Sequence, residues 1–231
     1  MFLLVILIGF AIISYAVQSR LKSKFKKYSK IALSSGISGR EAAEKMLKDN
    51  GIYDVKVMSV EGQLTDHYNP SNKTVNLSSE VYNNRSAAAV AVAAHEVGHA
   101  VQHAKAYAFL ELRSTLVPLQ NVSAKIINFV FMAMLFGAFA LPQLINPQLA
   151  LMVIIGCYTI FTLFAFITLP VEYDASKRGL AWMTTSGVTT PQEHDMAKDS
   201  LKWAARTYLV AAIASLVTLL YYIMMFLGNR D

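Results

Sequence analysis

The stretch of the chain that could carry chemistry is HEVGH, residues 95–99, which offers two histidines and a glutamate. His95 and His99 are four residues apart, so on a helix both imidazoles project from one face and can bind one metal ion. Zinc bonded to two such nitrogens lies about 2.0–2.1 Å from each. Glu96 lies about 100° around the helix from His95. There its carboxylate can take a proton from a zinc-activated water and pass it to a leaving amine. The spacing therefore predicts zinc-dependent peptide hydrolysis.

The two histidines leave the predicted metal site incomplete, because a catalytic zinc ion usually has three protein ligands and one water. His103 continues the series, but on a straight helix it lies about 12 Å from His95, at 1.5 Å per residue. Glu172 is the better prediction for the third ligand. It follows the third apolar segment directly, and two membrane spans return the chain to the side that it left.

Three polar residues follow Glu172 closely. Asp174 and Ser176 are candidates for hydrogen bonds that hold a ligand imidazole in the correct tautomer. Arg178 can pair with a carboxylate or a substrate carbonyl, or it can simply be a positive residue at a membrane boundary. His194 reads as a surface loop residue.

The elements that must position these residues are mostly apolar. The chain has 231 residues, of which 55% are hydrophobic and only 16% are charged, which points to a membrane. Transmembrane helices are predicted at residues 1–19, 119–141, 148–170 and 207–227, with a Pro/Asn turn over 141–148 between the second and the third. The single cysteine, Cys157, excludes an internal disulfide framework and reads as a packing residue.

The remaining residues, 20–118 and 171–206, carry most of the 21 Lys and Arg residues, and the predicted turn carries none. By the positive-inside rule these two segments are cytoplasmic, and both the N- and the C-terminus lie outside. The net charge of +6 comes largely from a basic cluster at residues 20–30, directly after the first span. Its predicted partner is the lipid bilayer rather than nucleic acid.

Segment 20–118 has the signals of a small α+β region. Ser38 to Glu41 reads as a capping box that opens a helix ending at Gly51. Residues 53–60 and 73–78 alternate like two short strands, with a polar loop between or beside them. Ser86 then opens a helix that is apolar nearly all round and should be buried. This buried helix carries the histidines.

Two stretches of the sequence, DHYNPSNKTVNLSSEVYNNRSAAAVAVAAHEVGHAVQH and LPVEYDASKRGL, resemble the neutral zinc metallopeptidases of bacterial membranes, the YugP-like family. The likeness covers nearly the whole chain, and the order of the motifs is similar to that of the HtpX and CAAX prenyl proteases. It implies that His95, His99 and Glu172 bind one zinc ion (Zn2+) per chain, as in gluzincins, with Glu96 as the catalytic base. Those larger relatives have an aspartate where this chain has Ser176, and Asp174 could replace it.

The same resemblance suggests how a substrate is held. In zinc peptidases of this type, a strand ahead of the metal helix pairs with an extended peptide, so the backbone of Val75, Asn76 and Leu77 is expected to bind substrate as an edge strand. An ordinary edge strand is the alternative. His67 could contact the substrate or stabilise an oxyanion, although a polar loop histidine is more often neither.

The predicted fold is therefore a mainly α membrane protein, with four transmembrane helices and a small cytoplasmic α+β zincin-like metalloprotease region that has a short edge strand. The predicted function is a multi-pass zinc metalloendopeptidase of the bacterial cell membrane, acting on peptides or membrane proteins at the cytoplasmic face. One alternative is a site-2-type intramembrane protease, because residues 86–104 are apolar enough to enter a bilayer. Another is a non-catalytic zinc-binding membrane protein, a sensor or an assembly scaffold, in which Glu96 would have no role as a base. A metal-free reading makes His95 and His99 a pair of core histidines with Glu96 as their partner. The sequence predicts neither the substrate nor the oligomeric state.

Overall fold

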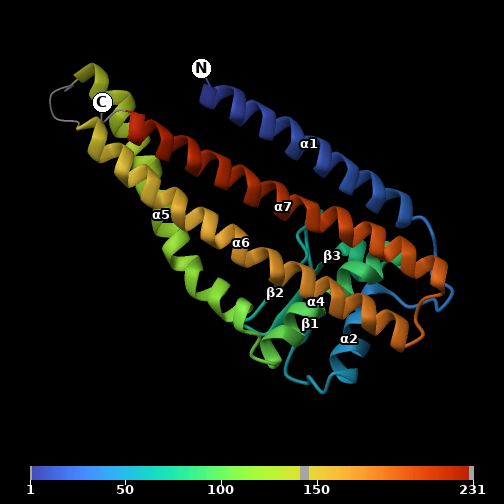
Figure 1. The fold of residues 1–231 in the computed structure, drawn as a ribbon. Coiled ribbons are helices and arrows are strands. Elements are labelled where there is room, and N and C mark those ends of the chain that lie inside the picture. Colours follow the sequence, from blue (N-terminus) through green and yellow to red (C-terminus); the bar gives the residue numbers. More distant parts are fainter. Residues whose placement is uncertain (1, 141–145, 229–231) are drawn as a thin grey trace. The chain divides into compact units, whose positions relative to one another are not determined.

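The computed structural model describes residues 2–140 and 146–228 of the chain. Figure 1 shows the elements in this part. The helices are α1 (Phe2–Tyr28), α2 (Gly39–Asp49), α3 (Ser79–Asn83), α4 (Ala87–Ala104), α5 (Ala108–Ala140), α6 (Pro147–Thr185) and α7 (Pro191–Gly228). The strands are β1 (Lys56–Val60), β2 (His67–Asn69) and β3 (Thr74–Ser78). The fold is thus mainly helical with one small sheet, as predicted.

The chain divides into two compact units. One, called here the apolar unit, contains residues 1–14, 112–169 and 208–231. The other, called here the mixed unit, contains residues 15–111 and 170–207, and with them the whole sheet and helices α2, α3 and α4. Helices α1, α5, α6 and α7 contribute residues to both units.

Four of the described helices are long and apolar enough to cross a membrane, namely α1, α5 as far as Phe136, α6 and α7. The prediction of four apolar helices is therefore confirmed. All four are longer than the predicted spans. Helix α1 continues to Tyr28 and α5 already begins at Ala108. Helix α6 continues through Pro170 to Thr185, and α7 already begins at Pro191. Glu172 is consequently presented by a helix, and His194 lies in the first turn of α7 rather than in a loop.

Most of the predicted turn over 141–148 lies outside the described residues, but its end shows how α6 begins. The side-chain oxygen of Asn146 accepts hydrogen bonds from the backbone N–H groups of Gln148 (3.0 Å) and Leu149 (3.1 Å). An Asn side chain in this place satisfies N–H groups that have no partner inside the helix. The Pro/Asn pair therefore acts as a helix start.

The apolar unit is held together by large side chains. Ile127, Leu151, Ile154, Cys157 and Tyr222 form its buried cluster, and Cys157 is a free buried cysteine, as predicted. Many of its other large apolar side chains are exposed, with Phe129 as the extreme at 73%. Exposed apolar surface on this scale is what a bilayer rather than water would cover.

The mixed unit has its own core, in which α2, α4 and β3 pack with the ends of α6 and α7 that belong to it. The predicted capping box of α2 is present: Ser38 Oγ accepts from Glu41 N–H (3.2 Å), and the Glu41 carboxylate accepts from Ser38 N–H (2.7 Å). The helix ends at Asp49, and Gly51 follows with a φ of +70°. Glycine adopts that left-handed conformation at little cost.

The sheet has the order β1-β3-β2, in which β1 pairs parallel and β2 antiparallel with β3. The strand predicted over 73–78 is therefore present, but the prediction that it is an edge strand is wrong. Both sides of β3 are paired, and Val75 and Leu77 are fully buried. The free edges of the sheet belong to β1 and to β2, which forms within the segment predicted as a polar loop.

Helix α4 is buried, as its sequence predicts. Ser86 caps it by accepting a hydrogen bond from Ala89 N–H (3.3 Å). Glycines allow close contact with α6: a Cβ added at Gly98 would lie 2.4 Å from the carbonyl oxygen of Ala175, and one at Gly179 would lie 2.9 Å from that of Ala94. The backbones of α4 and α6 are thus in direct contact beside the histidines.

Candidate metal centre

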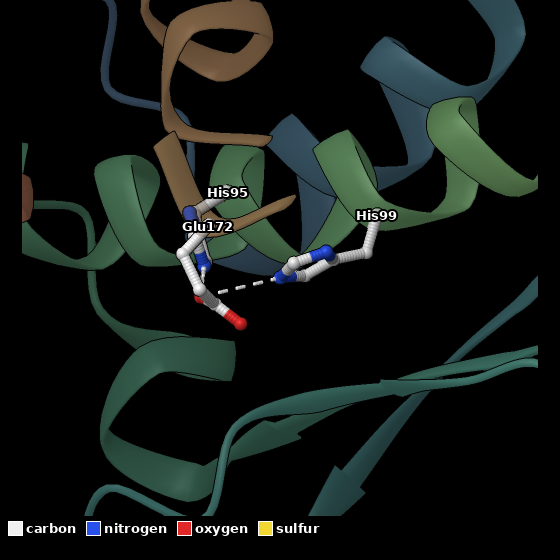
Figure 2. A group of neighbouring side chains, drawn as sticks. All are labelled: His95, His99 and Glu172. Atoms are coloured by element: carbon white, nitrogen blue, oxygen red, sulfur yellow. Dashed lines mark ion pairs between the residues drawn. The ribbon is translucent and has the colours of Figure 1, made fainter. Parts of the chain in front are cut away.

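Three predicted ligands meet at this crossing, His95 and His99 from α4 and Glu172 from α6 (Figure 2). Glu172 Oε2 lies 3.3 Å from His95 Nε2 and 3.6 Å from His99 Nε2. Each of the three residues has a possible ligand atom within 4.8 Å of those of the other two. The side chains of His99 and Glu172 are buried. Helix α4 and the part of α6 that follows Pro170 thus bring together residues from distant parts of the sequence. His99 and Glu172 are 73 positions apart.

The spacing of these atoms fits a metal ion. Ligand atoms that are each about 2.0–2.1 Å from a tetrahedral zinc ion are about 3.3–3.4 Å apart. Charge-assisted hydrogen bonds between imidazolium and carboxylate would be shorter, at about 2.7–2.9 Å. Two imidazole nitrogens and one carboxylate oxygen are also the donor set of catalytic zinc sites, which keep a fourth position open.

The protonation of His99 depends on its burial and on the nearby Glu172. Burial disfavours the charged imidazolium and lowers the pKa of His99, but the nearby carboxylate of Glu172 favours the charged form and outweighs that effect. The pKa of His99 therefore lies above its ordinary value. A metal ion can bind Nε2 of His99 only when that nitrogen has lost its proton.

Each ligand imidazole has a second contact through its Nδ1 atom. His95 Nδ1 lies 3.0 Å from Ser176 Oγ, and His99 Nδ1 lies 3.0 Å from Gln102 Oε1. Ser176 thus lies within hydrogen-bond distance of a predicted ligand. Asp174 contacts neither histidine: its carboxylate accepts a hydrogen bond from Gln102 Nε2 (2.8 Å).

Gln102 is the residue that sequence reasoning missed. It is fully buried, and its Nε2 also donates to the backbone carbonyl of Val171 (2.8 Å). A signal was present in the sequence, because Gln102 lies three residues after His99 and therefore next to it on a helix. Arg178 pairs with Asp174 at 2.5 Å, one of the roles expected for it.

Glu96 lies beside the ligands but is not one of the three converging residues. Its Oε2 accepts a hydrogen bond from the backbone N–H of Tyr68 (3.0 Å), and it is 8% exposed. The edge strand β2 thus contacts the predicted catalytic base directly. A carboxylate oriented by a backbone N–H and placed next to a metal site can act as a general base.

The two remaining histidines of the motif region have partners of their own. His103 Nδ1 lies 2.8 Å from the Tyr68 hydroxyl, and His103 is not part of the converging group. His67 Nδ1 lies 2.7 Å from the carbonyl oxygen of Thr65. A carbonyl only accepts, so this nitrogen carries the proton and Nε2, 3.3 Å from the Asn76 side-chain nitrogen, is the acceptor. In this tautomer His67 has no second N–H for an oxyanion.

Comparison with known proteins places the whole chain in one family. A family model described as "Putative neutral zinc metallopeptidase" matches residues 3–227. The chain is 40% identical over 220 residues to the "Putative membrane protease YugP" of Bacillus subtilis (strain 168), an alignment that covers 95% of this chain and 94% of that protein. No solved structure matches the chain.

Proposed function

The chain belongs to the "Putative neutral zinc metallopeptidase" family, and from that premise we propose that it is a membrane-embedded zinc metalloendopeptidase. The observation that carries this proposal is the convergence of His95, His99 and Glu172 with Glu96 beside them. A purely structural zinc site usually has four protein ligands and needs no base. Three ligands and an adjacent carboxylate fit hydrolysis better than a non-catalytic role.

The roles of the residues follow from their chemistry. His95, His99 and Glu172 would hold one zinc ion, which when bound supplies Lewis-acid activation of water and of the scissile carbonyl. Glu96 takes the proton from the attacking water and later delivers it to the leaving amine. The N–H of Tyr68 holds one oxygen of that carboxylate. Ser176 and Gln102 hold the two imidazoles in orientation.

The substrate in this proposal is an extended peptide segment that adds to the β2 edge of the sheet. Because β3 is paired on both sides, the edge strands are the places where strand addition can occur. Of the two, β2 reaches Glu96 through Tyr68. Because the N–H of Tyr68 is bonded to Glu96, a peptide would pair with the remaining backbone groups of β2 and have its backbone next to the proposed base.

Location in the cell membrane completes the proposal. Four apolar helices support a multi-pass membrane protein. The distribution of Lys and Arg supports a cytoplasmic position for the mixed unit, with both termini outside. The packing of α4 against α2 and the sheet favours cleavage at the membrane surface over the site-2-type alternative, because protein elements cover this helix.

Metal content and cleavage of unfolded β-casein by the detergent-purified protein test the function. We expect one zinc ion per wild-type chain, zinc lost in Glu172→Ala and zinc kept in His103→Ala. Glu96→Gln should keep zinc and lose at least about a hundredfold in cleavage rate, since it removes general-base catalysis. Wild-type cleavage by Glu96→Gln would refute the mechanism. Zinc kept by Glu172→Ala and lost by His103→Ala would refute the ligand set.

A further inference from the structure

We propose that Gln102 is a positioning residue that fixes the tautomer of His99 and ties this ligand to the backbone next to Glu172. The inference rests on the proposed zinc site. It adds a residue that lies outside the HExxH motif and that has no contact with substrate.

The hydrogen bonds of Gln102 determine which way its amide points. Nε2 lies 2.8 Å from the Val171 carbonyl oxygen and 2.8 Å from Asp174 Oδ2. A backbone carbonyl oxygen only accepts, so the amide NH2 group must face it, and the same nitrogen faces the Asp174 carboxylate. The other end of the amide, Oε1, therefore faces His99 Nδ1 at 3.0 Å.

This orientation determines the protonation of the imidazole. An amide oxygen only accepts hydrogen bonds, so His99 Nδ1 must carry the proton. In the neutral ring Nε2 is then unprotonated, and Nε2 is the atom that lies 3.6 Å from Glu172 Oε2. The metal-facing nitrogen of His99 is thus held ready to bind an ion without a change of tautomer.

Ser176 cannot impose the same choice on His95. A hydroxyl both donates and accepts, so the 3.0 Å contact between Ser176 Oγ and His95 Nδ1 is compatible with either tautomer. Gln102 is different also because it is fully buried. A reversed amide would place its oxygen against two other oxygens, which is costly without water to compensate.

Gln102 also connects the two ligand-bearing helices. Val171, whose carbonyl accepts from Gln102, directly precedes Glu172 in the chain. One side chain thus contacts a proposed ligand on α4 and the backbone next to the proposed ligand on α6. The network continues outward. Arg178 pairs with Asp174 at 2.5 Å and lies over the Tyr107 ring, 5.8 Å from its centroid. The guanidinium and the Gln102 amide thus donate to the same oxygen of the Asp174 carboxylate.

The first test is the tautomer itself, in metal-free protein at a pH where His99 is neutral. Long-range 1H–15N NMR spectra distinguish a ring protonated at Nδ1 from one protonated at Nε2. We expect His99 to be protonated at Nδ1 in the wild type and to become a mixture in Gln102→Met, which keeps the side-chain volume. Gln192→Met, at the exposed start of α7, is the matched control and should leave the His99 spectrum unchanged.

The second test is zinc affinity, measured by competition with a chelator. Loss of a hydrogen bond to a metal-binding histidine typically weakens binding about 10- to 100-fold, and we expect this for Gln102→Met. Gln102→Glu should also lose affinity, because two carboxylates then face each other. Adding Asp174→Asn should restore part of it, since the new amide donates to Glu at 102 while that carboxylate still accepts from His99. A volume defect would not be rescued in this way.

The outcomes separate the two proposals. A wild type that binds no zinc refutes the proposed function, while the spectrum of His99 still reports on Gln102. An unchanged His99 tautomer in Gln102→Met, with zinc affinity within about threefold of wild type, overturns the positioning role. If Gln102→Met does not fold, the Gln102→Glu and double variants decide, and absence of rescue counts against the proposal.

Discussion

Helix α6 passes through two regions that are built in opposite ways. In the apolar unit its neighbours are bulky aliphatic and aromatic side chains, and a Cβ at Gly156 would meet nothing within 4 Å. In the mixed unit its backbone is in contact with α4, and a Cβ at Gly179 would lie 2.9 Å from the Ala94 carbonyl. The difference teaches that close packing of α6 is concentrated beside the proposed metal ligands, while the apolar unit has space for an added side chain.

The largest expected effect comes from separating α4 and α6 at their crossing. In Gly98→Ala the new methyl group would lie 2.4 Å from the Ala175 carbonyl oxygen, which is backbone and cannot rotate away. Such overpacking typically costs about 1–3 kcal/mol, and the proposed zinc ligands on the two helices would move apart. We expect a lower unfolding temperature in detergent and loss of stoichiometric zinc.

Gly156→Ala makes the same chemical change in the part of α6 that belongs to the apolar unit. The position is open, and alanine is a better helix former than glycine by about 0.8–1.0 kcal/mol. An unchanged or slightly higher unfolding temperature is expected, with full zinc content. If both variants behaved alike, the contrast between the two regions of α6 would be wrong.

A change of pH should alter the zinc affinity of the site through His99. The pKa of His99 is raised because the nearby carboxylate of Glu172 outweighs burial, so its proton competes with zinc up to a higher pH than for a free histidine. Zinc affinity should therefore fall as pH decreases through this pKa, by about tenfold per pH unit for each proton displaced. Affinity that stays constant between pH 7.5 and pH 5.5 would contradict the assigned ligands.

A smaller effect is expected from Ser176→Ala, which removes the second contact of His95. Because a hydroxyl does not select the tautomer, the loss of zinc affinity should be at the low end of the usual range, about tenfold. Affinity titrations of Ser176→Ala and Gln102→Met under the same conditions test this ranking. A larger loss in the serine variant would reverse the importance assigned to the two contacts.

The smallest expected loss lies away from both helices, at the start of α2. Ser38→Ala removes one half of the capping box and typically costs about 1 kcal/mol. A modest drop in the unfolding temperature with unchanged zinc affinity is expected. A change in zinc affinity would mean that α2 contributes to the geometry of the site beyond its packing against α4.

The sequence allowed much of this to be predicted because the signals are local. Apolar segments of sufficient length, the capping box at Ser38 and the HEVGH spacing each depend on neighbouring residues. The meeting of Glu172 with the two histidines was also predictable, since two membrane crossings constrain where the chain returns.

What sequence reasoning missed depends on contacts between distant residues. Alternation in 73–78 indicates a strand but not its neighbours, so it could not show that β3 would be paired on both sides. Strand β2 has only three residues within a polar segment, too few for a periodic pattern. Gln102 looked like an ordinary helix residue because its importance lies in contacts with Val171 and Asp174, about 70 positions away.

Strand β2 has a consequence for the entropy of binding. Besides its pairing with β3, it is fastened to α4 twice, through the N–H of Tyr68 on Glu96 and the hydroxyl of Tyr68 on His103. A short edge strand without such anchors would lose conformational freedom each time a peptide pairs with it. Here that loss is incurred during folding, so an arriving peptide has only its own backbone to order. These two bonds, one of which holds the proposed base Glu96, would thus favour tighter binding of extended segments.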